Sequence, residues 1–452
     1  MKENISHGET KYIKRRLAII VREAIEKFSV VVISGARQVG KSTMLTNEFS
    51  DFTYFTLDNF DTIDMIKADS SFIFKQHDFI IIDEAQKFPA IFNAIKLAVD
   101  NDKNKRIIIS DSSNILLMKN ITESLAGRAL YFEMMPITFG EINGILTPTN
   151  FLNLWKDNYA DFNTKNIKKN ENIYDSKKFL DDLDDDDNDK KSINENKKIC
   201  AIVQNNSLVS LMMKGFMPRN IMAKDQNDVT LWLDGYVKTY LERDLRDLSQ
   251  VESIIDFRKV MQVLALRTGN ILNQADVSRD TGISNSTIYR YIKLLEISNI
   301  IERIPGFFTS KGKRITKSPK IYFVDPALSI FLSGYFDEES LGSSRKLGGY
   351  FETTVFFHLK CLCEMLKPSA KIHYWRTVLG KEVDFILEYG EKLLAIEVKI
   401  TKNPLVKDIK NLLIFIDEHP ETVIGILLHT GQEVKWLNSK VIAVPWQWID
   451  CA

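Results

Sequence analysis

The sequence contains little cysteine and no excess of charge of either sign. Its 452 residues include only four cysteines, and 60 lysine and arginine residues balance 60 aspartate and glutamate residues. Cys361 and Cys363 lack a second cysteine or histidine cluster at zinc spacing, so ordinary reduced thiols are expected. Because the chain as a whole is neutral, any basic surface that attracts nucleic acid must be local.

Long apolar runs, an amino-terminal signal segment and internal repeats are also missing. No apolar run approaches the roughly 20 residues that cross a membrane, and the start of the chain lacks the pattern of a signal peptide. We therefore expect a cytoplasmic protein that makes no contact with a membrane. The length is sufficient for two or three domains.

The chain is organised around residues 35–43, which fit the phosphate-binding pattern G-x-x-x-x-G-K-[ST]. An apolar run at 30–33 predicts a buried strand before this loop, and residues 44–46 can open a helix after it. Backbone N–H groups and the positive end of the helix would then face the phosphates of ATP. Lys41 would reach the β- and γ-phosphates, and the Ser42 hydroxyl would hold Mg²⁺. The predicted nucleotide-binding residues are Gly35, Ala36, Arg37, Gln38, Val39, Gly40, Lys41, Ser42 and Thr43.

A second apolar strand ends in two acidic residues. Residues 79–82 are apolar and are followed by Asp83 and Glu84. Asp83 would bind Mg²⁺, and Glu84 would polarise the attacking water, which favours ATP hydrolysis over mere nucleotide binding. For Asp83 taken alone, the alternative is a strand-end acid that caps the next helix.

Two later positions extend the predicted nucleotide site. A strand at 106–110 leads into polar residues, where Ser112 would sense the γ-phosphate or cap the helix that follows. Arg128 follows a helix end and would act as an arginine finger, either in its own chain or in a neighbouring copy, which implies a homo-oligomer. The alternative for Arg128 is a surface ion pair.

This half of the chain resembles the AAA-type ATPases of bacteria and archaea, within the additional-strand, catalytic-glutamate class. Residues 35–42, 56–58, 82–86 and 124–128 are similar to an uncharacterised prokaryotic family that joins such an ATPase to a C-terminal domain of unknown function. In the sensor position that family usually has a glycine where this chain has Asp111. The resemblance implies an ATPase domain over residues 1–155.

The composition changes between residues 156 and 198. This stretch is rich in aspartate, asparagine and lysine and has almost nothing to bury, so it predicts a disordered insertion. Its acidic run lacks the glycine and the closing glutamate of an EF-hand loop. A solvated linker is therefore expected rather than a cation site.

Residues 199–335 contain a candidate helix-turn-helix. Helices are predicted at 254–266, 274–280 and 285–296, with Gly282 in the tight turn before the last one. The start of the last helix would meet DNA, and a basic hairpin that also includes Lys317 and Lys320 would contact the backbone as a wing. The alternative is a winged helix used only as a lid or a protein contact. The predicted DNA-binding residues are Asn285, Ser286, Thr287, Arg290, Lys311, Lys313 and Arg314.

Residues 336–452 carry a last group of charged residues. Two strands joined by the turn at 390–391 would place Asp384 opposite Glu397, with Lys399 on the same face. A metal ion that bridges the two acids would satisfy them, Lys399 would orient or activate water, and Glu352 from a helix would complete the site. The three strand residues resemble the D…E-x-K motif of the PD-(D/E)xK restriction-endonuclease-like fold, in which the helix acid is also a metal ligand. The alternative is a salt-bridge network on an inactive domain.

We therefore predict an α/β protein with an AAA-type parallel-sheet domain, a helical and winged-helix region, and a restriction-endonuclease-like α/β domain. Its cofactors would be ATP and Mg²⁺ and its partner would be DNA, so the leading prediction is an ATPase coupled to DNA binding. Two alternatives stay open: an ATP-driven switch that acts on a protein through an inactive nuclease-like docking domain, and a DNA-binding regulator that uses ATP only as a signal.

Overall fold

The computed structural model describes residues 12–69, 71–111, 125–156, 207–244, 251, 253–308 and 318–451. The chain divides into two compact units. The first comprises Met1–Ile137, Met217–Asp228 and Ile297–Asn299, and the second comprises Thr138–Phe216, Val229–Glu296 and Ile300–Ala452. The predicted α/β class is confirmed, because a parallel sheet is accompanied by further sheets and helices.

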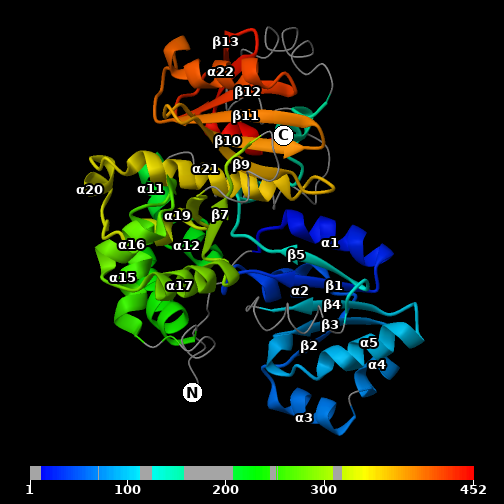
Figure 1. The fold of residues 1–452 in the computed structure, drawn as a ribbon. Coiled ribbons are helices and arrows are strands. Elements are labelled where there is room, and N and C mark those ends of the chain that lie inside the picture. Colours follow the sequence, from blue (N-terminus) through cyan, green and yellow to red (C-terminus); the bar gives the residue numbers. More distant parts are fainter. Residues whose placement is uncertain are drawn as a thin grey trace. The chain divides into compact units, whose positions relative to one another are not determined.

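The first unit is built on a five-stranded parallel sheet in the order β2-β3-β4-β1-β5 (Figure 1). The additional strand β4 lies between β1, which precedes the phosphate-binding loop, and β3, which ends in the acidic pair. The strands are β1 (Val30–Ser34), β2 (Thr53–Thr56), β3 (Phe79–Asp83), β4 (Arg106–Ser110) and β5 (Ala129–Glu133). The helices are α1 (Arg16–Lys27), α2 (Lys41–Glu48), α3 (Phe60–Ala68), α4 (Phe72–Gln76), α5 (Ile91–Asn101) and α12 (Pro218–Ile221).

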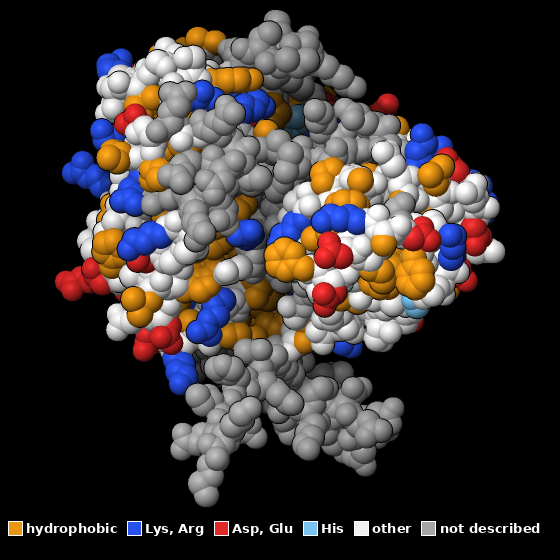
Figure 2. Space-filling model, turned by 90° about the horizontal axis from the view of Figure 1, so that it is seen from below, with side chains coloured by type: hydrophobic (Ala, Val, Ile, Leu, Met, Phe, Trp, Pro, Cys, Tyr) orange, Lys and Arg blue, Asp and Glu red, His pale blue; other side chains and the backbone are white. Residues whose placement is uncertain are grey.

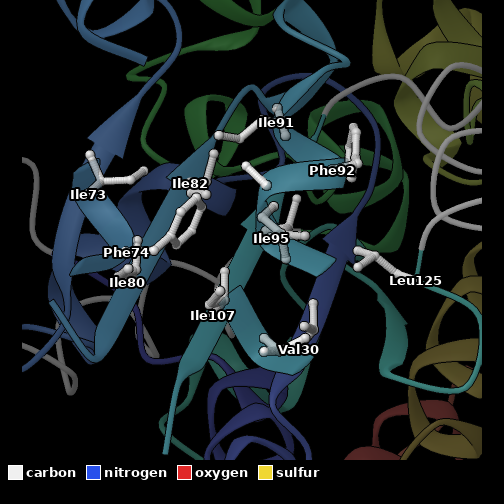
Figure 3. Packing of buried hydrophobic residues seen from close by; sticks show 14 of the residues in the cluster. Val30, Ile73, Phe74, Ile80, Ile82, Ile91, Phe92, Ile95, Ile107 and Leu125 are labelled. Carbon is white, nitrogen blue, oxygen red and sulfur yellow. The ribbon is translucent and has the colours of Figure 1, made fainter. Parts of the chain in front are cut away.

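Valine and isoleucine fill the central strands because both faces of this sheet are covered. A strand buried on both faces needs a continuous apolar run rather than alternation. Figure 3 shows side chains of β3 and β4, among them Ile82 and Ile107, in one cluster with Ile91, Phe92 and Ile95 of α5. This packing fixes the strand ends from which the phosphate-binding loop and the acidic pair project.

In the second unit, three helices are followed by strands of a small sheet. The helices α15 (Ile254–Ala265), α16 (Gln274–Thr281) and α17 (Asn285–Ile297) lie within one residue of their predicted bounds. The antiparallel sheet has the order β6-β8-β7 and consists of β6 (Asn270–Ile271), β7 (Ile301–Ile304) and β8 (Lys320–Phe323). One face of α17 is an apolar stripe, and its residues Ile288, Tyr291, Ile292 and Leu295 are buried.

The second unit also contains a six-stranded mixed sheet in the order β13-β14-β12-β11-β10-β9. Tyr389 pairs with Lys392, which confirms the predicted two-residue turn between β10 and β11. The strands are β9 (Lys371–Arg376), β10 (Glu382–Tyr389), β11 (Lys392–Lys399), β12 (Thr422–His429), β13 (Lys435–Asn438) and β14 (Val441–Pro445).

Two helices, α21 (Leu347–Cys363) and α22 (Lys410–Glu418), cover opposite faces of this sheet. Phe385 of β10 stacks on Phe356 of α21, whereas the next residue, Ile386, belongs to the same core cluster as Phe415 of α22. Successive side chains of a strand point to opposite faces, so the two helices lie on different sides.

Tyr374 of β9 joins the small sheet to the large one within the second unit. The Phe307 N–H, just after β7, donates to the Tyr374 carbonyl at 2.6 Å, and the Tyr374 N–H donates to the Pro305 carbonyl at 3.2 Å. The Tyr374 hydroxyl donates to the Ser318 carbonyl, just before β8, at 2.6 Å. One residue therefore holds both ends of the hairpin that connects β7 and β8.

The remaining described elements connect these layers. Those with helical structure are two 3₁₀ turns (Ala85–Lys87 and Val406–Ile409), α7 (Phe139–Ile142), α8 (Thr149–Asn153), α11 (Leu208–Lys214), α13 (Gln226–Tyr236), a π-helical stretch (Val237–Asp244), α19 (Pro326–Leu332) and α20 (Glu338–Gly342). The last strand, β14, ends at Pro445 and continues as a 3₁₀ turn (Trp446–Asp450), because proline removes the next ladder donor. The predicted insertion, apart from Lys156, lies outside the described residues. None of the helices that the structure describes is long and apolar enough to cross a membrane.

Candidate functional sites

The phosphate-binding loop has a backbone that few residues adopt. Gln38 and Gly40 have positive φ angles, of 64° and 96°. A Cβ on Gly35 would lie 2.4 Å from the Met134 carbonyl oxygen, so the close approach of the segment after β5 requires glycine there. The shape of the loop is thus set by its own backbone and by the segment after β5, without a ligand.

Lys41 is buried inside this loop. Its Nζ donates to the carbonyl oxygens of Gly35 and Ala36 at 2.9 and 3.0 Å, and the residue is 6% exposed. Burial lowers the pKa of Lys41 to about 8, and the carboxylates of Glu84 and Asp111 oppose that shift only in part. The ammonium group therefore carries a charge that neighbouring side chains balance incompletely.

Ser42 and Asp83 meet although one strand separates β1 from β3. The Ser42 hydroxyl donates to Asp83 Oδ2 at 2.6 Å, and the Glu84 N–H donates to Asp83 Oδ1 at 3.1 Å. The Tyr54 hydroxyl, from β2, donates to the same Oδ2. A hydroxyl beside a carboxylate is the oxygen pair that Mg²⁺ takes, so these residues fit the predicted ion.

Glu84 lies next to this pair in a strained conformation. Its φ is 55°, in the left-handed region, and Gln86 Nε2 donates to its Oε2 at 2.5 Å. Non-glycine residues in this region cluster at functional sites because the surrounding structure must hold them there. The carboxylate that would polarise water is therefore held by both its backbone and its neighbour.

Two contributors to the nucleotide site were not predicted from the sequence. Arg15 is buried just before α1 and donates to the carbonyl oxygens of Val39, Met135 and Pro136 at 3.0, 2.5 and 3.0 Å. It thereby ties the phosphate-binding loop to the segment after β5. Tyr54, described above, is the second. Their sequence signals are slight: an arginine directly before an amphipathic helix, and a tyrosine in a short strand.

The other residues predicted for the nucleotide site, Arg128 and Ser112, have different outcomes in the structure. Arg128 forms a bidentate ion pair with Asp100 of α5, at 2.7 and 3.0 Å, with both side chains 36% exposed. This is the surface ion pair given above as the alternative, and the arginine-finger role stays a prediction. Asp111 is fully buried, and Ser112 lies outside the described residues.

The start of α17 presents the predicted polar residues outward. Asn285, Ser286 and Arg290 are exposed and Thr287 is half-buried, while the Ser284 hydroxyl accepts the Thr287 N–H at 3.3 Å as the helix cap. Basic and acidic side chains are interspersed over the face of the molecule in Figure 2. The predicted wing residues Lys311, Lys313, Arg314 and Lys317 lie outside the described residues.

Lys320 does not belong to a basic surface, so its prediction as part of the wing is wrong. The residue is 1% exposed and lies among carboxylates. Its Nζ is 2.8 Å from Glu352 Oε1, 2.5 Å from Glu382 Oε1 and 3.8 Å from Asp384 Oδ1. Burial alone would lower the pKa of Lys320, but the carboxylates of Glu352, Asp384 and Glu382 raise it above its ordinary value.

Asp384 and Glu397 lie at the end of the β10–β11 ladder, as the turn predicted. Asp384 Oδ2 accepts the Val398 N–H at 2.9 Å, close to where the register of β10 on β9 shifts. Lys399 Nζ donates to Glu397 Oε1 at 2.6 Å. Burial and the nearby Asp384 carboxylate raise the pKa of Glu397, whereas Lys399 opposes that shift.

The acids fit a divalent cation in part. Glu397 Oε2 is buried and has no hydrogen-bond partner among the residues that the structure describes, and its side chain is 6% exposed. Such an atom needs a cation or a donor. Within the same residues, no three acidic, histidine or cysteine side chains form a metal-binding set. Mg²⁺ often takes only one or two protein carboxylates and keeps several waters, so Asp384 and Glu397 suffice for it.

The strand order, the loop with its buried lysine and the hydroxyl–carboxylate pair define the class of P-loop nucleoside triphosphatases. More narrowly, the family model described as "AAA domain" matches residues 27–143, so the chain carries an AAA-type P-loop ATPase domain. Two further models match the domains of unknown function DUF8612, at residues 205–339, and DUF4143, at residues 347–449.

The chain is also similar to whole proteins. The uncharacterized proteins Mb2031c of Mycobacterium bovis and Rv2008c of Mycobacterium tuberculosis are each 25% identical to it over 436 residues, which is 96% of this chain and 83% of theirs. Among solved structures, the Walker-type ATPase PABY2304 of Pyrococcus abyssi aligns with a TM-score of 0.42 and 14% identity, over 71% of this chain and 96% of that one.

Proposed function

We propose that this protein is a Mg²⁺-dependent ATPase that couples ATP hydrolysis to DNA bound by its second unit. The observation that carries the ATPase part is the buried Lys41 beside the Ser42–Asp83 pair, since a buried cation without full compensation is suited to polyphosphate. Lys41 would bind the β- and γ-phosphates, Ser42 and Asp83 would hold Mg²⁺, and Glu84 would take a proton from the attacking water. The ion itself would neutralise developing phosphate charge.

Two variants separate nucleotide binding from hydrolysis. Lys41→Ala is expected to weaken ATP binding by about 2–5 kcal/mol, or about 30- to 4,000-fold, because it removes one partner of a buried charge pair. Glu84→Gln should retain ATP binding and lower turnover by about 10²–10⁴-fold, the usual contribution of a general base. Calorimetric titration and phosphate release measure the two quantities. Unchanged ATP affinity in Lys41→Ala would refute the proposed site.

DNA binding is supported by the order of elements in the second unit. Three helices, a first strand between α15 and α16, and a hairpin after α17 follow the order of a winged helix, and α17 begins with exposed polar residues. Fluorescence anisotropy with a random DNA duplex tests this. Binding should weaken as salt rises. Arg290→Ala should reduce affinity, whereas Arg279→Ala, which removes an exposed arginine from α16, should not.

A second activity, metal-dependent cleavage of DNA, is favoured by Glu397 Oε2, which has no hydrogen-bond partner among the described residues, and by the nearby Asp384 carboxylate. In this proposal Lys399 orients or activates water at the site. Plasmid DNA incubated with Mg²⁺ or Mn²⁺, with and without ATP, should be cut by the wild type and not by Asp384→Ala. If the wild type never cuts and never binds DNA, the ATP-driven switch with an inactive docking domain becomes the better account.

A further inference from the structure

The acidic cluster of the second unit already contains a cation of its own. The side chain of Lys320 is 2% exposed, and three carboxylates surround its Nζ, two of them within hydrogen-bonding distance. An ammonium group has three donors and no acceptor, so Glu352, Glu382 and Asp384 are the partners that it needs. The Lys320 ammonium therefore neutralises part of the negative charge of these three carboxylates without a metal ion.

Lys320 cannot easily leave, because its backbone is held on both sides. It opens β8, the central strand of the small sheet, and pairs there with Ile304 of β7 and Ile271 of β6. Tyr322, one pleat further along β8, donates its hydroxyl to the same Glu352 oxygen at 2.5 Å. Lys320 and Tyr322 thus both donate hydrogen bonds to Glu352 Oε1.

These contacts divide the carboxylates of the cluster into two sets. Glu352 and Glu382 face the Lys320 ammonium, and Asp384 lies at the border, with Oδ1 3.8 Å from that ammonium. Glu397 lies on the other side. Its Oε1 pairs with Lys399, and its Oε2 has no hydrogen-bond partner in the part of the chain that the structure describes. Only this second set contains a buried carboxylate oxygen that still needs a positive partner.

We propose that Lys320 takes the place of a second metal ion, so that the site binds a single divalent cation through Asp384 and Glu397 and Glu352 is not a ligand. The inference rests on the proposed cleavage function and deepens it, since it fixes the number of ions and adds Lys320 as a positioning residue. Lys320 would hold Glu352 away from the cation and would set the orientation of Asp384.

The number of bound Mn²⁺ ions tests this directly. Electron paramagnetic resonance would count Mn²⁺ on the full-length, nucleotide-free protein, with Glu397→Gln as the reference that subtracts binding elsewhere in the chain. The wild type should bind one ion more than this reference. Lys320→Met should bind two more, because three carboxylates then lose their cation. Two extra ions in the wild type, or equal numbers in the wild type and Lys320→Met, would overturn the inference.

A second variant keeps the test decisive if Lys320→Met does not fold. Glu352→Gln retains the size of the side chain and should change the Mn²⁺ affinity of the wild-type site by no more than about twofold, since Glu352 is not a ligand in this proposal. A loss of tenfold or more would overturn it. If the wild type and every variant bind no more Mn²⁺ than Glu397→Gln, the proposed metal site fails together with the inference, which distinguishes that failure from a wrong ion number.

Discussion

Two of the buried lysines, Lys41 and Lys320, have surroundings that differ in kind. Lys41 in the first unit donates to carbonyl oxygens of its own loop, and its pKa is lowered. Lys320 in the second unit lies among three carboxylates, and its pKa is raised. A buried charge is costly unless it is paired. We infer that Lys41 binds the negative charge of a ligand, the phosphates of ATP, whereas Lys320 neutralises carboxylates of the protein itself.

The comparison predicts that the same substitution has a large effect on stability at Lys320 and a small one at Lys41. Lys320→Met should lower the free energy of unfolding by about 3–5 kcal/mol, because it leaves buried carboxylates without their cation. Lys41→Met should change it little, since the lost hydrogen bonds are offset by removal of a desolvated charge. Urea unfolding of both variants measures this. An equal loss in the two would show that the lysines have the same role.

The shape of the phosphate-binding loop predicts the next largest effect. Gly35→Ala should destabilise the first unit by about 1–3 kcal/mol, because the new Cβ would overlap the Met134 carbonyl. Gly235→Ala is a matched control, since nothing lies within 4 Å of its added Cβ. Thermal unfolding and ATP titration of both variants would test whether the loop around Lys41 needs this close approach. Wild-type behaviour of Gly35→Ala would contradict it.

The hydroxyl of Tyr54 should have a smaller effect, confined to the metal. Tyr54→Phe removes one donor from Asp83 Oδ2 and leaves the ring, so we expect the Mg²⁺ concentration for half-maximal ATPase activity to rise about fivefold, equivalent to about 1 kcal/mol. Tyr131→Phe removes a hydroxyl that contacts Ser34 instead and should not shift this concentration. The same shift in both variants would assign the effect to general loosening of the sheet.

The smallest effect on stability is expected at Arg128. Its ion pair with Asp100 is exposed, so Arg128→Ala and Asp100→Ala should both leave the unfolding transition nearly unchanged. ATP turnover separates the two residues. If Arg128 acts as an arginine finger, only Arg128→Ala lowers turnover. If the finger acts on a neighbouring copy, adding an excess of Glu84→Gln, which retains Arg128, restores turnover by assembly in trans. Equal turnover in both variants and the wild type would leave Arg128 with the surface pair alone.

Local patterns in the sequence predicted most of the nucleotide site. Nine consecutive residues specify the phosphate-binding loop, and two acids after an apolar strand specify the acidic end of β3. A two-residue turn likewise fixed the register of Asp384 and Glu397. Each of these features is specified by residues that are close together in the sequence, so it can be predicted from one sequence.

The surroundings of Lys320 depend on contacts that no local pattern carries. Its partners lie 32, 62 and 64 positions further along the chain, at Glu352, Glu382 and Asp384. From the sequence alone it resembled the end of a basic hairpin. The one available signal was its place directly before the apolar run at 321–324, where an unpaired charge would be expensive to bury.

The double hold of Tyr374 on the hairpin between β7 and β8 has a mechanical consequence. Because its main chain fixes the β7 side and its hydroxyl fixes the β8 side, a pull on that hairpin is carried into the edge of the large sheet instead of bending the small one. Lys320 links the same two sheets a second time, because its ammonium group in β8 pairs with Glu382 of β10. A displacement of the small sheet would therefore also move the carboxylates around Lys320.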